Sequence, residues 1–236
     1  MFEATAPLYD LIYAAMGKDY AAESEAVHRL VQGRRPGART LLDVACGTGG
    51  HLRHLRAHYE VVGADLVPAM LEEARGQLGD VELVEADMRT MDLGRRFDAV
   101  VCLFSSVGYL RDAAELDQAV GAMARHLSPG GVLVVDGWVR PDAWRDGSPP
   151  RVIVADDGGR SIVRVSRSER HGAVTQLEMH HLIATAEAIE HLVDHHEMRL
   201  FEPREYEAAF EAAGLPSEVV EGPMPGRDRY VGVAPA

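Results

Sequence analysis

The chain has 236 residues, of which 47% are hydrophobic and 26% are charged, so it can bury the core of one globular domain that carries a smaller appendage. Its formal net charge of −13 repels phosphate backbones and argues against nucleic acid as a partner. It has no apolar run of about 18 residues, and its first residues, MFEATAPLYD, lack the order of a secretion signal, so we predict a cytoplasmic protein with no membrane partner.

Two helical patterns begin the chain, at residues 8–16 and 19–33, where apolar side chains recur at four-residue spacing. Five short apolar runs rich in β-branched residues follow, and most of them are separated by further helical patterns. Such runs suit strands that are buried on both faces of a parallel sheet, so the alternation predicts a doubly wound α/β fold. The predicted strands are 40–45, 60–65, 81–86, 97–104 and 131–138, and the helices between them are 49–57, 68–78 and 112–127.

The character of the sequence changes after Trp138. Four strand-like segments follow one another with only the short turns DDGG, RHG and TAE between them, which predicts an antiparallel sheet. We therefore predict a core of residues 1–138 plus 201–236, and an appendage of residues 139–200 that covers the substrate site at the mouth of the core. The four strands of the appendage are 151–156, 161–169, 173–184 and 188–201, and the core ends with a helix at 203–214 and strands at 217–222 and 228–235.

Neither the cysteines nor the histidines specify a cross-link or a metal site. Cys46 and Cys102 lie in apolar stretches at the ends of predicted neighbouring strands, where reduced cysteines act as small core residues. Five histidines crowd the appendage, but adjacent residues of a strand point to opposite faces, so their spacing defines no metal site. We expect no metal, and we take His180 or His191 as the histidine that reaches the pocket.

The strongest local signal is LLDVACGTGGHL, residues 41–52. A buried strand runs into Gly47, Gly49 and Gly50 and then into a helix, and glycines allow a tight turn and a close approach of backbone N–H groups to a ligand. An ordinary strand-to-helix turn would look similar. The dinucleotide pattern G-x-G-x-x-G is not met, because Leu52 occupies the place of its last glycine. This argues against an NAD-dependent oxidoreductase.

The segment DVACGTG closely resembles the first motif of the class I methyltransferases, in which this loop carries the methionine part of S-adenosylmethionine. Asp65 ends the next strand about 20 residues on, where a carboxylate can accept hydrogen bonds from both ribose hydroxyls. Asp87 and Met88 match the positions that hold the adenine in that family. Taken alone, Asp65 could cap a helix and Asp87 could belong to a turn, but their order and spacing favour the cofactor. The resemblance implies a Rossmann-like class I methyltransferase fold with the antiparallel sheet as an insertion.

Nearly the whole length also resembles a narrower family, the N-methyltransferases that act on nucleotide-linked amino-deoxysugars in antibiotic biosynthesis, of the desosamine and mycaminose type. The resemblance implies methyl transfer from S-adenosylmethionine to the amine of a sugar linked to thymidine diphosphate (dTDP), as an N,N-dimethylation. The segments that carry it are YDLIY, GKDYAAE, LLDVACGTGGHL, ADMRTMDLGRRFDAVVCLFSSVGYL, HLSPGGVLVVDGW, LEMHHLIA, RLFEPREYEAAFEAAGL and PGRDRYVGV.

This resemblance implies two sets of site residues. Those expected to bind the cofactor are Tyr9, Ala45, Gly47, Gly49, Asp65, Asp87, Met88 and Leu103, and those expected to face the sugar nucleotide are Tyr20, Tyr109, Trp138, His180 and Arg227.

The chain also departs from the family at three places. Phe2 replaces a tyrosine, Asp65 stands where glutamate is common, and a tandem tryptophan is reduced to Gly137-Trp138. The last change implies a differently shaped sugar pocket.

Methyl transfer to an amine depends mainly on positioning, which supplies about 7 to 11 kcal/mol in favourable cases. Tyr109 follows the fourth predicted strand, at the carboxyl edge where doubly wound sheets place their chemistry, so we take it as the catalytic residue; the alternative is a packing aromatic. Arg227 stands in a turn rich in glycine and proline, and a planar guanidinium suits a diphosphate. A surface arginine is its alternative role.

Three questions stay open at the level of sequence. The acceptor could be another small oxygen, carbon or nitrogen compound, and the protein could bind the cofactor without catalysing a reaction. A homodimer is one assembly that the sequence allows.

Overall fold

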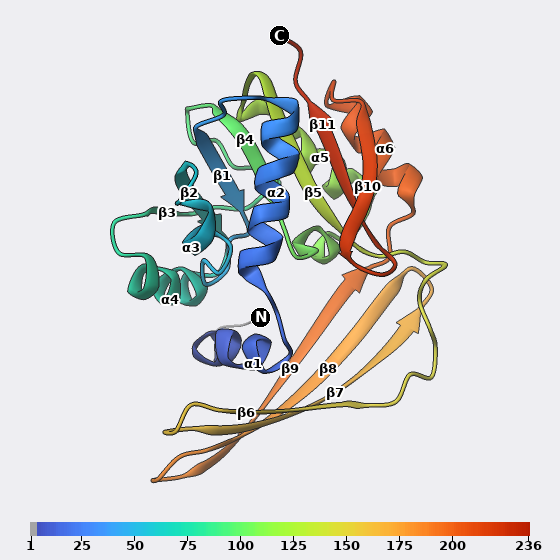
Figure 1. The fold of residues 1–236 in the computed structure, drawn as a ribbon. Helices are drawn as coiled ribbons and strands as arrows, with labels where there is room; N and C mark the ends of the chain where they lie inside the picture. Colours follow the sequence, from blue (N-terminus) through green and yellow to red (C-terminus); the bar gives the residue numbers. More distant parts are fainter. Residues whose placement is uncertain (1–3) are drawn as a thin grey trace.

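Seven strands form the core sheet of the computed structural model, which describes residues 4–236, and the five apolar runs between residues 40 and 139 supply its parallel part (Figure 1). Its strand order is β10-β11-β5-β4-β1-β2-β3. The five strands from β5 to β3 are parallel, and β11 runs antiparallel to both β5 and β10. The predicted doubly wound α/β arrangement is confirmed. The strands are β1 (Thr40–Val44), β2 (Glu60–Asp65), β3 (Glu82–Glu85), β4 (Phe97–Cys102), β5 (Leu127–Val139), β10 (Ser217–Met224) and β11 (Arg227–Val233).

Two of the helices begin after an aspartate whose side chain caps the first turn. The side chain of Asp19 accepts a hydrogen bond from Ala22 N–H at the start of α2, and Asp112 does the same for Glu115 in α5. The helix predicted over 49–57 is shortened to the single turn α3, because the glycine loop with its left-handed Gly49 precedes it. The helices are α1 (Tyr9–Ala15), α2 (Tyr20–Arg34), α3 (Leu52–Leu55), α4 (Pro68–Leu78), α5 (Ala113–Arg125) and α6 (Pro203–Ala212), with short 3₁₀ turns η1 (Ala6–Leu8) and η2 (Ser106–Tyr109).

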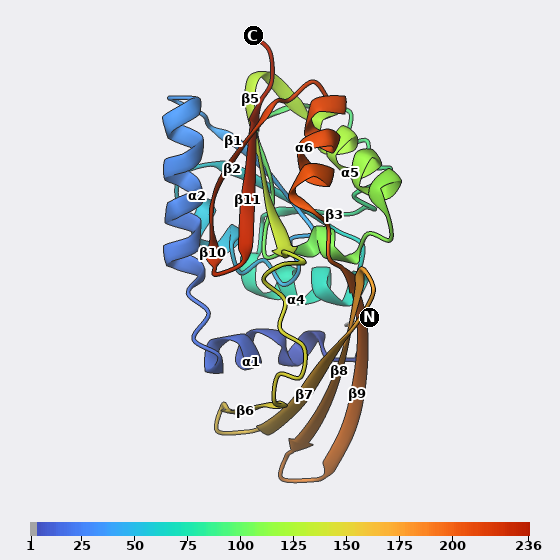
Figure 2. The ribbon, with the colours of Figure 1, turned by 90° about the vertical axis from the view of Figure 1, so that its right-hand side faces the viewer.

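Helices cover both faces of the core sheet. Alternate strand residues point to opposite faces, so Leu42 packs in the cluster that contains Met123 of α5 and Phe210 of α6, whereas its neighbour Leu41 packs with Val27 of α2. Figure 2 shows α2 on one side of the sheet and α5 with α6 on the other. The central strands β1, β4 and β5 are therefore buried on both faces, which explains why their sequences are nearly continuous apolar runs.

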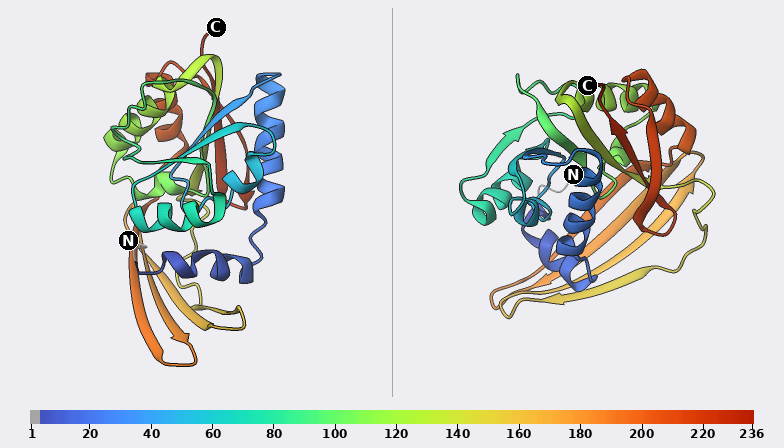
Figure 3. Two further views of the ribbon diagram at one scale, coloured as in Figure 1. Left: turned by 90° about the vertical axis from the view of Figure 1, so that its left-hand side faces the viewer. Right: turned by 45° about the horizontal axis from the view of Figure 1, so that its top comes forward.

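The second sheet is antiparallel and has the order β6-β7-β8-β9. It extends away from the core (Figure 3), and its inner face packs against α1: Leu8 and Ile12 join Ile162 and Ile183 in one apolar cluster. The first helix thus links the second sheet to the core. The bounds of the strands are β6 (Arg151–Asp156), β7 (Ser161–His171), β8 (Val174–Ala184) and β9 (Ile189–Arg199).

The division into residues 1–138 plus 201–236 and residues 139–200 stays our proposal. Phe2, one of the three departures from the family pattern, lies outside the described residues. Over residues 4–236, none of the helices has the length and apolar character needed to cross a membrane.

A buried ion pair joins β5 to β11. Arg229 and Asp136 are cross-strand partners, and the Arg229 Nε–H donates to Asp136 Oδ1 at 2.6 Å. Both side chains are at least 96% buried, being 4% and 1% exposed. The second carboxylate oxygen accepts a hydrogen bond from the backbone N–H of Phe104 at 3.1 Å. One carboxylate therefore fixes both the closing strand of the sheet and the loop that follows β4.

Replacing Asp136 with Asn should lower the free energy of unfolding by about 3 to 5 kcal/mol, because Arg229 would keep a buried charge without its carboxylate. Urea denaturation followed by circular dichroism measures this change. As a matched control, Arg29→Gln breaks the exposed pair with Glu25 and should change the free energy by less than about 1 kcal/mol. Equal stability of the Asp136→Asn protein and the unsubstituted protein would contradict this role of the pair.

Candidate functional site

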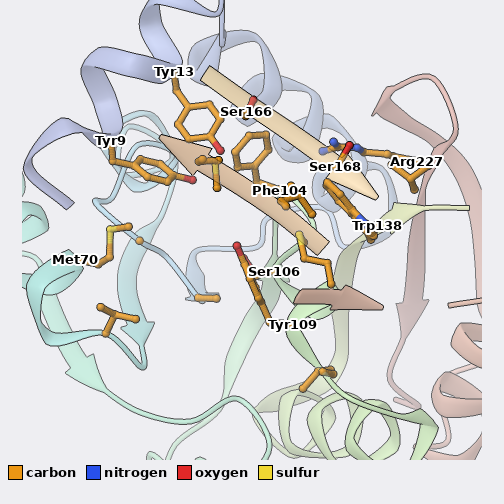
Figure 4. Close-up of a pocket in the computed structure, with 18 of the residues that line it drawn as sticks. Tyr9, Tyr13, Met70, Phe104, Ser106, Tyr109, Trp138, Ser166, Ser168 and Arg227 are labelled. Atoms are coloured by element: carbon orange, nitrogen blue, oxygen red, sulfur yellow. The ribbon is translucent and has the colours of Figure 1, made fainter. Parts of the chain in front are cut away.

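A cavity of about 630 Å³ lies between the carboxyl edge of the core sheet, α1 and the inner face of the second sheet (Figure 4). Ala45, Asp65, Asp87 and Phe104 reach it from the segments that follow β1, β2, β3 and β4. Parallel strands bring their carboxyl ends to one edge, which is where doubly wound sheets bind ligands. The cavity is lined by nine of the predicted site residues: Tyr9, Ala45, Gly47, Asp65, Asp87, Met88, Tyr109, Trp138 and Arg227.

The glycine loop shapes the first part of the cavity. Ala45 and Gly47 have left-handed backbones, with φ of 59° and 58°, and a Cβ added at Gly47 would meet no protein atom within 4 Å. Gly47 therefore leaves an open surface toward the cavity. Gly49 faces the other way, because a Cβ there would lie 2.5 Å from Leu78 Cδ1 in α4. The loop has the shape of a cradle that a side chain at residue 47 would fill.

Asp65 stands at the end of β2 with its carboxylate held by two backbone donors. Gly47 N–H donates to Oδ2 at 2.8 Å, and Val67 N–H donates to Oδ1 at 2.9 Å. Burial raises the pKa of Asp65, while these backbone hydrogen bonds favour its charged form. Each carboxylate oxygen can accept more than one hydrogen bond. The side chain is thus both oriented and able to take a pair of hydroxyl donors.

The carboxylate of Asp87 is held by Arg89. The Arg89 Nε–H donates to Asp87 Oδ1 at 3.0 Å, and its Nη1–H donates to Glu115 Oε1 at 2.6 Å. Hydrogen bonding to this guanidinium lowers the pKa of Asp87, so the carboxylate stays ionised. The arrangement fixes Asp87 as an acceptor at the edge of the cavity, beside Met88.

The far end of the cavity is aromatic and cationic. The guanidinium of Arg227 lies 4.1 Å from the ring centre of Trp138, and Ser168 lies beside them (Figure 4). The Trp138 ring is locked by its indole N–H, which donates to Thr175 Oγ at 3.3 Å. Burial lowers the pKa of Arg227, and within residues 4–236 no carboxylate forms an ion pair with it. A desolvated cation of this kind suits an anionic ligand group.

A strained turn carries Tyr109 to the middle of the cavity. Phe104 and Ser105 both have left-handed backbones, with φ of 57° and 67°, a conformation that costs non-glycine residues about 1 to 3 kcal/mol each. The Asp136 carboxylate accepts from Phe104 N–H, and the Ser105 hydroxyl donates to Gly137 O at 2.7 Å. Hydrogen bonds to two residues of β5 therefore hold the turn in this conformation, and the turn leads directly into η2.

Close packing then fixes η2 itself. A Cβ at Gly108 would lie 2.7 Å from Met198 Cε and 3.1 Å from Trp138 Cβ, so glycine lets this turn approach β5 and β9 without displacing either side chain. The hydroxyl of Tyr109 lies 3.0 Å from Nδ1 of His196, a buried residue of β9. The second sheet thus contributes a side chain that contacts the predicted catalytic residue.

Four predicted site residues do not line the cavity, and their roles stay predictions. Leu103 is buried in the core on the α2 side of the sheet. The ring of Tyr20 packs over Gly50, where an added Cβ would lie 2.7 Å from Tyr20 Cε1. Gly49 packs against α4. His180 lies on the outer face of the second sheet, where its Nδ1 lies 2.9 Å from Nε2 of His191, and His196 contacts Tyr109 from the inner face.

The sequence analysis did not single out several cavity residues. Arg164, Ser166 and Ser168 line the cavity from β7, and their spacing of two residues places them on one face of the strand. That alternation of polar side chains within SIVRVSRSE was an available signal. Tyr13 and Phe104 also line the cavity, with ring centres 5.1 Å apart, and nothing in the sequence alone pairs them.

Comparison with known proteins gives a consistent result. A family model for the methyltransferase domain matches residues 41–131. The dTDP-3-amino-3,4,6-trideoxy-alpha-D-glucopyranose N,N-dimethyltransferase of Streptomyces venezuelae is 47% identical over 230 residues, which cover 97% of each chain. The crystal structure of DesVI from Streptomyces venezuelae matches with a TM-score of 0.92 at 47% identity over 98% of each chain. A third match is CalS10 from Micromonospora echinaspora, an amino pentose methyltransferase involved in calicheamicin biosynthesis. Its structure with bound S-adenosylmethionine matches with a TM-score of 0.86 at 42% identity over 96% of each chain. The fold is therefore the class I methyltransferase fold.

Replacing Asp65 with Ala should weaken binding of S-adenosylmethionine by at least about tenfold, because each hydrogen bond to a charged group contributes about 1.5 to 3 kcal/mol. Isothermal titration calorimetry measures the dissociation constant. Asp80→Ala, which changes an exposed carboxylate after α4, is the matched control and should bind as the unsubstituted protein does. If both variants bind equally well, the ribose is held elsewhere.

Replacing Gly47 with Val should abolish cofactor binding, because a branched side chain would fill the cradle. Gly79→Val controls for backbone strain, since Gly79 is also left-handed (φ of 64°) and open to solvent, but lies at the end of α4 outside the cavity. Both variants should lose stability, and only the first should lose binding. Calorimetry together with thermal melts separates the two effects. Normal affinity in Gly47→Val would remove the loop from the site.

Proposed function

The chain belongs to the N,N-dimethyltransferases of dTDP-linked amino sugars, and we propose that it transfers methyl groups from S-adenosylmethionine to the amine of a dTDP-linked amino-deoxysugar in antibiotic biosynthesis. The observation that carries this proposal is the single cavity that runs from the carboxylates of Asp65 and Asp87 to the guanidinium of Arg227. One end has acceptors for a nucleoside, the other a desolvated cation for a diphosphate, and Tyr109 lies between them.

The residues at the first end fit the cofactor. Gly47 leaves room along the backbone, the Asp65 carboxylate is placed to accept from the two ribose hydroxyls, and Asp87 with Met88 would hold the adenine. S-adenosylmethionine supplies the methyl group on a positively charged sulfur. Positive charge moves from sulfur to nitrogen during transfer, so little new charge has to be stabilised and holding the two reactants in line matters most.

The residues at the second end fit a sugar nucleotide. Arg227 would pair with the diphosphate through parallel hydrogen bonds, and its guanidinium packs against the face of the Trp138 ring. Arg164 adds a second buried guanidinium that lines the cavity, and it forms no ion pair with a carboxylate of residues 4–236. These charges favour an anionic acceptor over a neutral quinone or free amino acid.

A panel of amino-sugar nucleotides tests the function. The protein is incubated with S-adenosylmethionine and dTDP-linked sugars that carry the amine at carbon 3 or carbon 4, and the products are analysed by mass spectrometry. We expect a gain of two methyl groups on at least one sugar. No methylated product with any dTDP-amino sugar would direct the search to another small acceptor. Retention of the cofactor without turnover would indicate a binding protein.

Arg227→Ala should raise KM for the sugar nucleotide by about tenfold or more while kcat is largely preserved, because a diphosphate contact is made equally in the ground and transition states. The KM for S-adenosylmethionine should not move. Arg204→Ala, at an exposed position of α6, is the matched control. Steady-state kinetics with both substrates varied measure these values, and an unchanged sugar-nucleotide KM would show that Arg227 does not bind the diphosphate.

We further propose a homodimer that forms through the outer face of the second sheet. Its apolar side chains are unusually exposed: Val154 of β6 is 66% exposed and Leu182 of β8 is 48% exposed. Strand register places Val154, Val163 and Leu182 in one row across the sheet, and Val152 and Val193 extend the apolar surface. A contiguous apolar patch of this kind marks an interface, and a two-fold axis would bury the same patch on both subunits.

Replacing both Val154 and Leu182 with Glu should convert the dimer to a monomer, because like charges would face each other across the two-fold axis. Light scattering coupled to size exclusion measures the mass. The matched control is Glu187→Lys with Glu190→Lys, which alters charge near the β8–β9 turn outside the patch. A monomeric unsubstituted protein would refute the proposed interface.

A further inference from the structure

A diphosphate held by Arg227 divides the acceptor into two parts. It joins the sugar on one side to the nucleoside on the other, so the two parts extend from the guanidinium in different directions. In the function proposed above, on which this inference rests, the sugar amine lies near Tyr109 in the middle of the cavity. The nucleoside therefore extends from Arg227 on the side that faces away from Tyr109.

The loop of residues 140–150, which joins β5 to β6, lies on that side (Figure 1). The strand order β6-β7-β8-β9 puts β6 and β9 at opposite edges of the second sheet, and Tyr109 contacts β9. The loop begins after Val139, which is the cross-strand partner of Arg227, and it ends at Arg151 in β6. It thus starts beside the diphosphate-binding guanidinium and leads to the edge opposite the predicted catalytic residue.

Contacts with the turn between β10 and β11 hold this loop next to Arg227. The backbone N–H of Arg140 donates to Gly226 O at 2.8 Å. A Cβ added at Gly226 would lie 2.6 Å from Ala143 Cβ, so the loop touches the residue that directly precedes Arg227. Trp144 follows Ala143, and its backbone N–H donates to Arg140 O at 3.2 Å. The indole is therefore carried by a segment that is anchored beside the guanidinium.

The half-buried side chain of Trp144 lines this end of the cavity. Its indole N–H donates to Asp146 Oδ1 at 2.8 Å, which orients the ring from within the loop. Within residues 4–236, neither an aromatic ring nor a cation stacks on this indole, whereas the face of Trp138 is occupied by Arg227. An oriented indole of this kind can stack with a flat ring of a ligand.

We propose that Trp144 forms the nucleobase subsite of the acceptor, with the pyrimidine ring of the nucleotide stacked on its indole. Tyr109, Arg227 and Trp144 then contact the sugar, the diphosphate and the base in the order in which a sugar nucleotide links them. Met224, at the end of β10, also lines the cavity and adds apolar surface for the ring. Stacking on an aromatic side chain strengthens binding by about 5- to 150-fold per base and tolerates every base, so Trp144 contributes affinity without reading the identity of the base.

The chain has two tryptophans, which allows an optical test. In Trp138→Phe the remaining indole is that of Trp144, and its fluorescence should be quenched by dTDP because the base stacks on the ring. Inorganic pyrophosphate, which has no base, should leave the emission unchanged. Emission that does not change at a dTDP concentration shown by calorimetry to be saturating would overturn the proposal.

Isothermal titration calorimetry on proteins that keep Trp138 gives an independent test, because it separates the base from the diphosphate. Trp144→Ala should weaken binding of dTDP by about tenfold or more, while the Kd for pyrophosphate stays within about twofold. Trp144→Phe keeps a ring that can stack and should recover most of the affinity. Arg227→Ala should weaken both ligands. The matched control is Ile189→Ala, which removes an exposed apolar side chain outside the cavity and should bind dTDP normally.

Thermal melts establish that each variant is folded. If Trp144→Ala does not fold, Trp144→Leu takes its place, because it fills space without offering an aromatic face. Equal losses for dTDP and pyrophosphate would indicate a structural effect of the loop and would overturn the proposal, as would an unchanged affinity for dTDP. Failure of the unsubstituted protein to bind dTDP would instead overturn the proposed function.

Discussion

The buried pair of Asp136 and Arg229 is the interaction on which the active edge of this molecule depends. It closes the core sheet, because β11 is the only neighbour of β5 on that side, and it also accepts the backbone N–H of Phe104. Together with the hydrogen bond from the Ser105 hydroxyl to Gly137 O, that acceptor holds two consecutive left-handed residues in place. The turn they form leads into η2 and brings Tyr109, the predicted catalytic residue, to the cavity, so an ion pair within the sheet helps to place that side chain.

A methyltransferase must bring two ligands together, and the core sheet provides a site for only one of them. The parallel strands end in Ala45, Asp65 and Asp87, which suit a nucleoside. The inner face of the second sheet and α1 supply the opposite wall, with Arg164, Ser166 and Ser168. Since in-line transfer rewards position far more than acid or base strength, a rigid second wall is a physical requirement. The apolar cluster of Leu8, Ile12 and Ile162 provides that rigidity.

Predicted site residues that belong to the end of a parallel strand are the ones that line the cavity. Gly47, Asp65 and Asp87 lie at or just after the ends of β1, β2 and β3, and the carboxyl edge of a parallel sheet collects such residues without further information. Tyr20, Leu103 and His180 do not line the cavity, and their roles stay predictions. Whether a side chain points to the cavity, into the core or to solvent depends on strand register and packing, and a one-residue shift reverses its direction. His180 and His196 both lie in predicted strands, but only His196 faces Tyr109.

The sequence by itself determined the α/β order of elements, the glycine cradle and the carboxylates at its edge, because periodicity and local backbone chemistry act over a few residues. Only the tertiary structure decided which face of β9 meets η2, how Phe104 joins Tyr13, and how Arg227 comes to rest on Trp138. Each of those contacts joins residues that lie about 90 positions apart, and the contact between β9 and η2 also depends on how the second sheet docks on the core. Docking depends on the sum of many weak packing contacts, and no short motif encodes that sum.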